Sequence, residues 1–219
     1  MHNKAIVFDL DGTLADSSGC IVSAAHFTSQ QMGLNAVSDG AIRAMIGQPL
    51  GPMLTQLYGL QDSQVAMAIQ IYSEAYRRLA ATEERLFQGS LSLLQQLKAS
   101  GYRLAIATGK SQHGAEHASH RLGISDFFDG IHGILPGTPG KPDPAVLLRA
   151  MAGLGVSHDA CVMVGDTTFD LDLAHEVGVS TVAVSWGVHD KNTLLSRNPM
   201  YFVETFLRLQ QVLLSHFPF

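Results

Sequence analysis

Residues 4–17 of this 219-residue chain read KAIVFDLDGTLADS. After one lysine, four apolar residues run directly into Asp-Leu-Asp-Gly, a pattern typical of a buried strand that ends in a loop. Similar apolar runs occur at residues 102–108, 160–165 and 180–185. Helical periodicity separates them, at residues 91–99, 112–122, 144–153 and 168–177. Strands that alternate with helices of about ten residues predict an α/β fold with a doubly wound parallel sheet.

The segment from residue 16 to residue 85 breaks this alternation. It carries helical patterns and no strand pattern, with helices expected at residues 21–32, 39–46, 53–58 and 63–79. We therefore expect a core domain made of residues 1–15 and 86–219, interrupted by a helical cap domain at residues 16–85. The amphipathic residues 203–214 predict a last helix that closes the core.

The composition excludes several classes of protein. Hydrophobic residues make up 46% of the chain and charged residues 15%, which excludes a disordered polar chain. The formal charge is −5, with no basic cluster, so we expect no nucleic-acid partner. No apolar run reaches the ~18 residues of a membrane span, so we expect no membrane association. An acidic pair near the N-terminus and only two cysteines favour a cytoplasmic protein, expected as a monomer or weak homodimer.

Acidic residues gather where the predicted strands end. Asp9 and Asp11 follow the first strand, and Asp166 and Asp170 follow the third. Ligands of open parallel sheets bind beyond the carboxyl ends of the strands, so we expect all four carboxylates at one edge. Each pair shares a side, because the spacing is two on an extended segment and four at a helix start. A divalent cation would offset this crowding, although an Asp-Gly turn and a helix cap are alternative explanations.

An anion site is predicted beside these acids. Thr108 and Gly109 lie between a strand and a helix, where a hydroxyl and free N–H groups can bind an oxyanion; a simple helix cap is the alternative. Lys141 lies in a proline-rich and therefore stiff loop. It could supply a fixed positive charge for a phosphate, while the alternative is an ordinary surface lysine.

One motif points to different chemistry. Residues 113–117 read HGAEH, which matches the inverted zinc-protease pattern, and His120 extends the same helical face. Imidazoles with this spacing can hold a transition metal. We nevertheless expect this helix to lie beside the sheet, away from the carboxylates, and to present a solvated face.

In this order, the motifs resemble those of the haloacid dehalogenase-like hydrolase superfamily. The first motif, DLDGTLADS at residues 9–17, is similar to the DxDGTLxDS signature of that superfamily. Thr108, the KPDP sequence at residues 141–144 and the segment from Gly165 to Asp170 are similar to its second, third and fourth motifs. The resemblance extends to about residue 187. The helical insert after the first strand resembles the cap of the phosphoglycolate phosphatase and β-phosphoglucomutase group.

This resemblance implies a Rossmann-like core and a phosphatase mechanism. Asp9 would be the nucleophile that forms an aspartyl phosphate, and Asp11 the general acid and base. The phosphoryl oxygens would be bound by Thr108, Gly109 and Lys141. Mg²⁺ would be the cofactor, with ligands from Asp9, the Asp11 carbonyl and Asp166, and with Asp170 as a direct ligand or as outer-shell support.

The resemblance also implies a small phosphorylated metabolite as substrate. Residues 46–50 of the insert resemble the specificity loop of the group, in which Gly47 and Gln48 would face the substrate. Arg43 could bind a substrate carboxylate or second phosphate, while a surface arginine is the alternative. A phosphoglycolate phosphatase-like enzyme is the first hypothesis. A β-phosphoglucomutase-like phosphosugar mutase, a pyrophosphate or nucleotide phosphatase and a non-catalytic binding module remain as alternatives.

Overall fold

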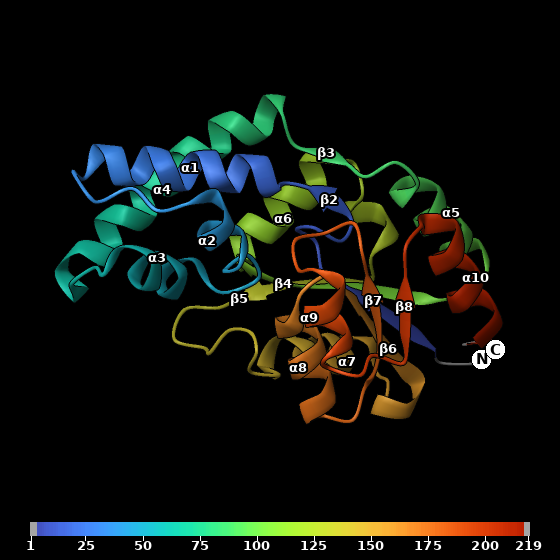
Figure 1. The fold of residues 1–219 in the computed structure, drawn as a ribbon. Coiled ribbons are helices and arrows are strands. Elements are labelled where there is room, and N and C mark those ends of the chain that lie inside the picture. The colour runs from blue at the N-terminus through green and yellow to red at the C-terminus, as the bar shows by residue number, and fades with distance from the viewer. Residues whose placement is uncertain (1–3, 217–219) are drawn as a thin grey trace.

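The computed structural model describes residues 4–216, and its centre is a six-stranded sheet in which every strand pair is parallel (Figure 1). The strand order is β5-β4-β1-β6-β7-β8. The strands are β1 (Ala5–Phe8), β4 (Arg103–Ser111), β5 (Gly130–Ile134), β6 (Cys161–Gly165), β7 (Ser180–Val184) and β8 (Tyr201–Val203). The predicted doubly wound α/β fold is therefore confirmed.

The central strand β1 is short and apolar because both of its faces are covered. Ile6 and Phe8 face one apolar cluster, and Ala5 and Val7 face the other. Helices α5 (Ser90–Ala99), α6 (Gln112–Arg121) and α10 (Phe206–His216) pack on the first face, whereas α7 (Ala145–Leu154) and α8 (Thr168–Glu176) pack on the second. A parallel sheet buried in this way needs continuous apolar strands instead of alternating ones.

The insert forms an apolar cluster of its own. This cluster joins helices α1 (Ser18–Gln31), α2 (Asp39–Arg43), α3 (Leu50–Tyr58) and α4 (Asp62–Thr82). A two-stranded antiparallel sheet, β2 (Ala15–Asp16) and β3 (Arg85–Leu86), lies where the chain leaves the core and returns to it. Figure 1 shows these helices to one side of the six-stranded sheet.

The structure also differs from the expectations. No strand pattern was apparent within residues 16–85, yet both ends of this segment pair in the β2–β3 sheet, which is only two residues long on each strand. Strands β5 and β8 were not predicted, because β5 reads GIHGI and β8 has three residues. The last helix begins at Phe206 and not at residue 203, since Val203 pairs with Val184 at the sheet edge. Among residues 4–216, no helix is both long and apolar enough to cross a bilayer.

The helices of the insert begin and end at different residues than expected. α1 begins at Ser18 and α3 at Leu50, three residues earlier than the periodicity predicted in each case. α2 ends at Arg43, ahead of a turn that reaches Gly47, where φ is +106°. A left-handed backbone of this kind ends a regular helix and favours glycine. The turn places residues 46–50 beside the core.

Candidate active site

Three buried carboxylates meet at the carboxyl edge of the sheet. Asp9 follows β1, while Asp166 and Asp170 follow β6, which is hydrogen-bonded to β1 through the pairing of Phe8 with Val164. One oxygen atom from each carboxylate lies within 4.8 Å of the others. Asp9 is 1% exposed, and the other two are fully buried. Two segments more than 150 residues apart in sequence thus build one acidic centre.

Lys141 is the buried counter-charge of this centre. Its Nζ atom lies 2.9 Å from Oδ1 of Asp9 and also donates to Oδ1 of Asp170. Burial lowers the pKa of Lys141, but the charges of Asp170 and Asp9 outweigh this effect and raise it above its ordinary value. The proline-rich loop before α7 therefore brings its lysine into the site, and not to the surface.

The acidic centre carries more negative charge than Lys141 can offset. Three ionised carboxylates and one ammonium group leave two negative charges, which are costly in a buried place. Burial, followed by the charge of Asp170, raises the pKa of Asp9 to about 7. Burial, followed by the charge of Asp9, raises the pKa of Asp166 well above its ordinary value. A bound dication would remove this excess.

The donor set fits magnesium. Oδ2 of Asp9 is buried and has no hydrogen-bond donor among residues 4–216. All three residues offer carboxylate oxygens, which Mg²⁺ prefers, and nitrogen or sulfur ligands are absent from the group. The side chain of Asp11 does not belong to this group of three carboxylates. Asp11 would therefore bind a metal ion through its main-chain carbonyl oxygen.

Neighbouring hydroxyl and amide groups fix Asp166. Oδ1 of Asp166 accepts a hydrogen bond of 2.7 Å from Oγ1 of Thr13, and Oδ2 accepts one of 2.9 Å from the N–H of Val188. Gly12 passes so close that a Cβ atom there would lie 2.2 Å from Oδ2 of Asp166. The glycine of the DLDG sequence is therefore required by this close approach as well as by its φ of +81°.

Asp170 has two structural roles at once. Its Oδ2 accepts from the N–H and the hydroxyl of Thr167, which is the N-cap residue of α8, so the capping explanation is correct. Its Oδ1 accepts from Lys141, so it also belongs to the acidic centre. The two explanations weighed for the Asp166 and Asp170 spacing are compatible.

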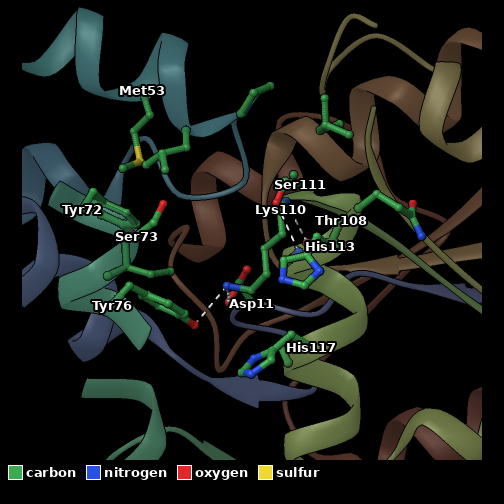
Figure 2. Close-up of a pocket in the computed structure, with 18 of the residues that line it drawn as sticks. Asp11, Met53, Tyr72, Ser73, Tyr76, Thr108, Lys110, Ser111, His113 and His117 are labelled. Carbon is green, nitrogen blue, oxygen red and sulfur yellow. Dashed lines mark hydrogen bonds and ion pairs between the residues drawn. The ribbon is translucent and has the colours of Figure 1, made fainter. Parts of the chain in front are cut away.

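Asp11 lies apart from the acidic centre and has its own cation. Its Oδ1 accepts a hydrogen bond of 2.6 Å from Oγ of Ser17 and lies 3.0 Å from Nζ of Lys110. Lys110 also donates to Oη of Tyr76 at 3.0 Å and lies 4.3 Å from the centre of that ring. Figure 2 shows Lys110 reaching from the core toward both partners. Because Tyr76 belongs to α4, this arrangement joins the insert to the core.

Sequence reasoning gave no role to Lys110 or Tyr76. Lys110 directly follows Thr108 and Gly109, so its position in the predicted anion loop was an available signal. Tyr76 lies in a long amphipathic helix, where an aromatic residue at helical spacing indicates only packing. Ser17 had a signal as well, because it ends the first motif.

Thr108 and Gly109 lie within β4, and not between a strand and a helix as expected, because β4 continues to Ser111. Ser111 is the N-cap residue of α6, so the helix-cap alternative for Thr108 is wrong. Thr108 and Gly109 line a cavity with Asp9 and Asp11, and Thr108 is 1% exposed. A Cβ atom on Gly109 would lie 2.3 Å from the carbonyl oxygen of Gly47, so the loop of the insert packs directly on this end of β4.

Two of the three predicted specificity residues line the same cavity. Gly47 and Gln48 are part of its wall. Arg43 is not part of that wall, and its Nη1 atom donates to Oγ of Ser18 at 2.8 Å.

The cavity lies between the insert and the core and has a volume of about 750 Å³. His113 and His117 of α6 are exposed, as expected for a solvated helix face. Both nevertheless line this cavity together with Asp9 and Asp11, so the helix does not lie away from the carboxylates as expected. The reason is that α6 begins directly after β4, whose last residues include Lys110. The centres of the two imidazole rings are 6.3 Å apart. Among residues 4–216, the cluster of side chains that could hold a metal ion consists of Asp9, Asp166 and Asp170 and contains neither histidine.

Comparison with known proteins agrees with this geometry. Residues 6–184 match the family model described as haloacid dehalogenase-like hydrolase. The chain is 35% identical to a probable phosphatase, IndB, of Dickeya dadantii, over 92% of this chain and 89% of that one. It is 31% identical to a phosphoglycolate phosphatase of Rhodospirillum rubrum, over 84% and 80%.

A solved structure shows the same fold. A hydrolase of the haloacid dehalogenase-like family from Streptococcus pneumoniae is 34% identical and superposes with a TM-score of 0.84, covering 95% of this chain and 98% of that one. The family match spans most of the chain and includes both segments of the acidic centre. The chain belongs to the haloacid dehalogenase-like hydrolase family.

Proposed function

We propose that this protein is a Mg²⁺-dependent phosphatase of small phosphate monoesters that works through an aspartyl phosphate. The observation that carries the proposal is the position of Asp9, a buried carboxylate between Lys141 and two further acids, at the wall of a cavity. The name of the Dickeya relative and that of the Rhodospirillum relative support the same reaction class.

Asp9 is the proposed nucleophile. One of its oxygens would attack phosphorus, so that a P–O bond forms to Asp9 and the bond to the leaving oxygen breaks. Lys141, the Thr108 hydroxyl and the Gly109 N–H would bind the phosphoryl oxygens as their charge changes. Lys141 suits this role because it is already held, buried and charged, against Asp9.

Asp11 is the proposed general acid and base. It would protonate the leaving oxygen and later take a proton from the water that hydrolyses the aspartyl phosphate. Its side chain lines the cavity that would receive the leaving group, outside the three-carboxylate group, and Ser17 and Lys110 hold its Oδ1 in place.

Asp9, Asp166 and Asp170, with the carbonyl of Asp11, are the proposed ligands of Mg²⁺. When bound, the ion supplies positive charge that stabilises the phosphoryl group in the transition state. Residues 16–85 are the proposed cap, which would exclude water and contact the leaving group, on a core of residues 1–15 and 86–219. A cytoplasmic location is part of the same proposal.

Phosphate release from p-nitrophenyl phosphate, with Mg²⁺ and then with excess EDTA, tests this function. We expect release that requires Mg²⁺ and that Asp9→Asn abolishes. Asp172→Asn is the matched control, because Asp172 lies on α8 but pairs with Arg197 at the surface. Absence of release by the wild type, or undiminished release by Asp9→Asn, would contradict the proposal. Interconversion of glucose phosphates without net phosphate release would favour a mutase.

A further inference from the structure

Resting on the proposed function, we propose that the leaving group of the natural substrate carries a flat aromatic ring, which binds against the apolar wall of the cavity. The phosphoryl group would occupy the end at Asp9 and Lys141. The ring would extend from Asp11 toward α3 and α4 of the insert. This assigns a substrate class that differs from a two-carbon acid such as phosphoglycolate.

The size of the cavity is the first observation. Its volume of about 750 Å³ lies within the range of ~300–1,000 Å³ of sites that enclose drug-sized molecules. A phosphoryl group with two carbons attached would fill only the end beside Asp9. The remaining apolar wall would stay hydrated, and the free energy of covering it would be lost.

The chemistry of the wall is the second observation. The insert contributes apolar and aromatic side chains to it, namely Ile46, Leu50, Met53, Ile69, Tyr72 and Tyr76. The rings of Tyr72 and Tyr76 are 9° from parallel, with centres 6.0 Å apart. Figure 2 shows both rings on the side of the cavity that faces Asp11, with Met53 close by. Aromatic and thioether groups of this kind contact the faces and edges of a planar ring favourably.

The third observation concerns the cationic side chains of the cavity. A small substrate with a carboxylate, such as phosphoglycolate, would need one of them to bind that carboxylate. Lys110 is already paired with Asp11 and Tyr76. Arg121 is paired with the buried Glu84 and donates to the carbonyl of Ala80. Arg77, His113 and His117 also line the cavity, but all three are exposed, and Arg43 does not line it. The interior of the cavity therefore offers a carboxylate little, whereas it offers a ring a large apolar surface.

Two matched esters test this inference on the wild-type enzyme. 2-Phenylethyl phosphate and ethyl phosphate are both esters of primary alcohols and differ only by the ring. We expect kcat/KM to be at least about tenfold higher for the phenylethyl ester, since burying a ring of this size is worth a factor of ten or more. Equal values, or a higher value for ethyl phosphate or phosphoglycolate, would overturn the inference.

A binding measurement separates this inference from the proposed function. 2-Phenylethylphosphonate and ethylphosphonate carry no ester bond to break, so calorimetry measures their affinities even if no phosphatase activity is found. We expect the phenylethyl compound to bind at least about tenfold more tightly. Equal affinities would refute the aromatic site whether or not phosphate is released from any ester.

A substitution that fills the cavity locates the ring. Ser73 follows Tyr72 on α4 and lines the cavity together with Tyr72 and Tyr76 (Figure 2). In Ser73→Phe we expect the preference for the phenylethyl ester to fall to near unity. Met67→Phe is the control, because Met67 is on the same helix, is 60% exposed and does not line the cavity; its preference should match the wild type. An unchanged preference in Ser73→Phe would place the ring elsewhere and contradict the proposal.

Discussion

The Nζ atom of Lys110 lies 3.0 Å from Oδ1 of Asp11, and this ion pair begins a chain of polar contacts that leads out of the site. Lys110 donates to the hydroxyl of Tyr76, which donates to Oε1 of Glu84 at 2.8 Å. Glu84 is buried and pairs with Arg121 at the end of α6. The chain thus connects the proposed acid and base of the core with a helix of the insert and with the segment that joins insert and core.

Removal of the Lys110 charge should slow catalysis. Lys110→Met leaves Asp11 held by Ser17 alone, so a less well-oriented carboxyl group should lower kcat by about tenfold to a hundredfold, a fraction of what acid–base catalysis contributes. Steady-state kinetics with p-nitrophenyl phosphate measure this. Lys98→Met is the control, since Lys98 pairs with Asp129 far from the cavity. A wild-type kcat in Lys110→Met would show that Ser17 suffices.

The Tyr76 hydroxyl should matter through Lys110. Tyr76→Phe keeps the ring and the cation–π contact but loses the hydrogen bonds to Lys110 and Glu84. We expect a smaller loss of kcat than in Lys110→Met, and little further loss when the two changes are combined, because they act on one chain of contacts. Measuring kcat for the two single variants and the double variant completes a double-mutant cycle. Fully multiplicative losses would mean that the two residues act independently.

The buried pair of Glu84 and Arg121 should dominate the stability of this region. Arg121→Met leaves the fully buried Glu84 carboxylate without its cation, so the free energy of unfolding should fall by about 3 kcal/mol. Denaturant titration measures the change. Lys191→Met breaks an exposed pair with Glu204 and should change stability by less than about 1 kcal/mol. Similar effects of the two substitutions would argue against a dominant buried pair.

The acidic centre could be predicted from the sequence because it depends only on local sequence patterns and on the topology of a parallel sheet. Asp9 and Asp166 directly follow apolar runs, and Asp170 lies four residues after Asp166 at the start of a helix. Parallel strands bring their carboxyl ends to one edge whatever the intervening chain does. Lys141 was also predicted, since prolines on both sides of its loop leave it little freedom. The same reasoning found the four inner strands, because a strand covered on both faces must be apolar along its whole length.

The remaining features depend on contacts that periodicity does not reveal. β5 and β8 are edge strands, which tolerate glycine, histidine and polar neighbours because only one side is paired. The Tyr76–Lys110 contact joins two elements whose distance depends on how the insert packs on the core. Arg43 is a further example, because it was predicted to face the substrate but donates to Ser18 instead. This hydrogen bond is a tertiary contact that the position of Arg43 on α2 does not indicate.

Stabilisation by Mg²⁺ should depend on pH with a definite sign. The pKa of Asp9 is about 7 in the metal-free fold, above its ordinary value of 3.8, so between these values the folded protein holds a proton that the unfolded chain has lost. In this window, rising pH destabilises the metal-free fold, and Mg²⁺ must displace the proton in order to bind. Mg²⁺ should therefore raise the melting temperature more at about pH 8 than at about pH 5.5.

Thermal melts with and without Mg²⁺ at the two pH values check this. At about a hundredfold excess over Kd and the higher pH, the shift should be about 5 to 10 °C for a chain of this length. Asp166→Asn should remove the shift, and Asp172→Asn should keep it. A shift that is larger at the acidic pH would contradict the ligand assignment.

Gly109→Ala should separate phosphate transfer from metal binding. The added Cβ would lie 2.3 Å from the carbonyl oxygen of Gly47, which is main chain and has no rotamer that avoids the contact, so the loop at residues 46–50 must move away from the core. We expect kcat/KM to fall by at least about tenfold, because a 1 Å displacement at a positioned group can cost a hundredfold. The Mg²⁺-induced melting shift should persist, since the three carboxylates lie on other segments. Gly19→Ala, where a Cβ meets nothing within 4 Å, should keep full activity. Wild-type kinetics in Gly109→Ala would show that the insert need not pack this closely on the core during turnover.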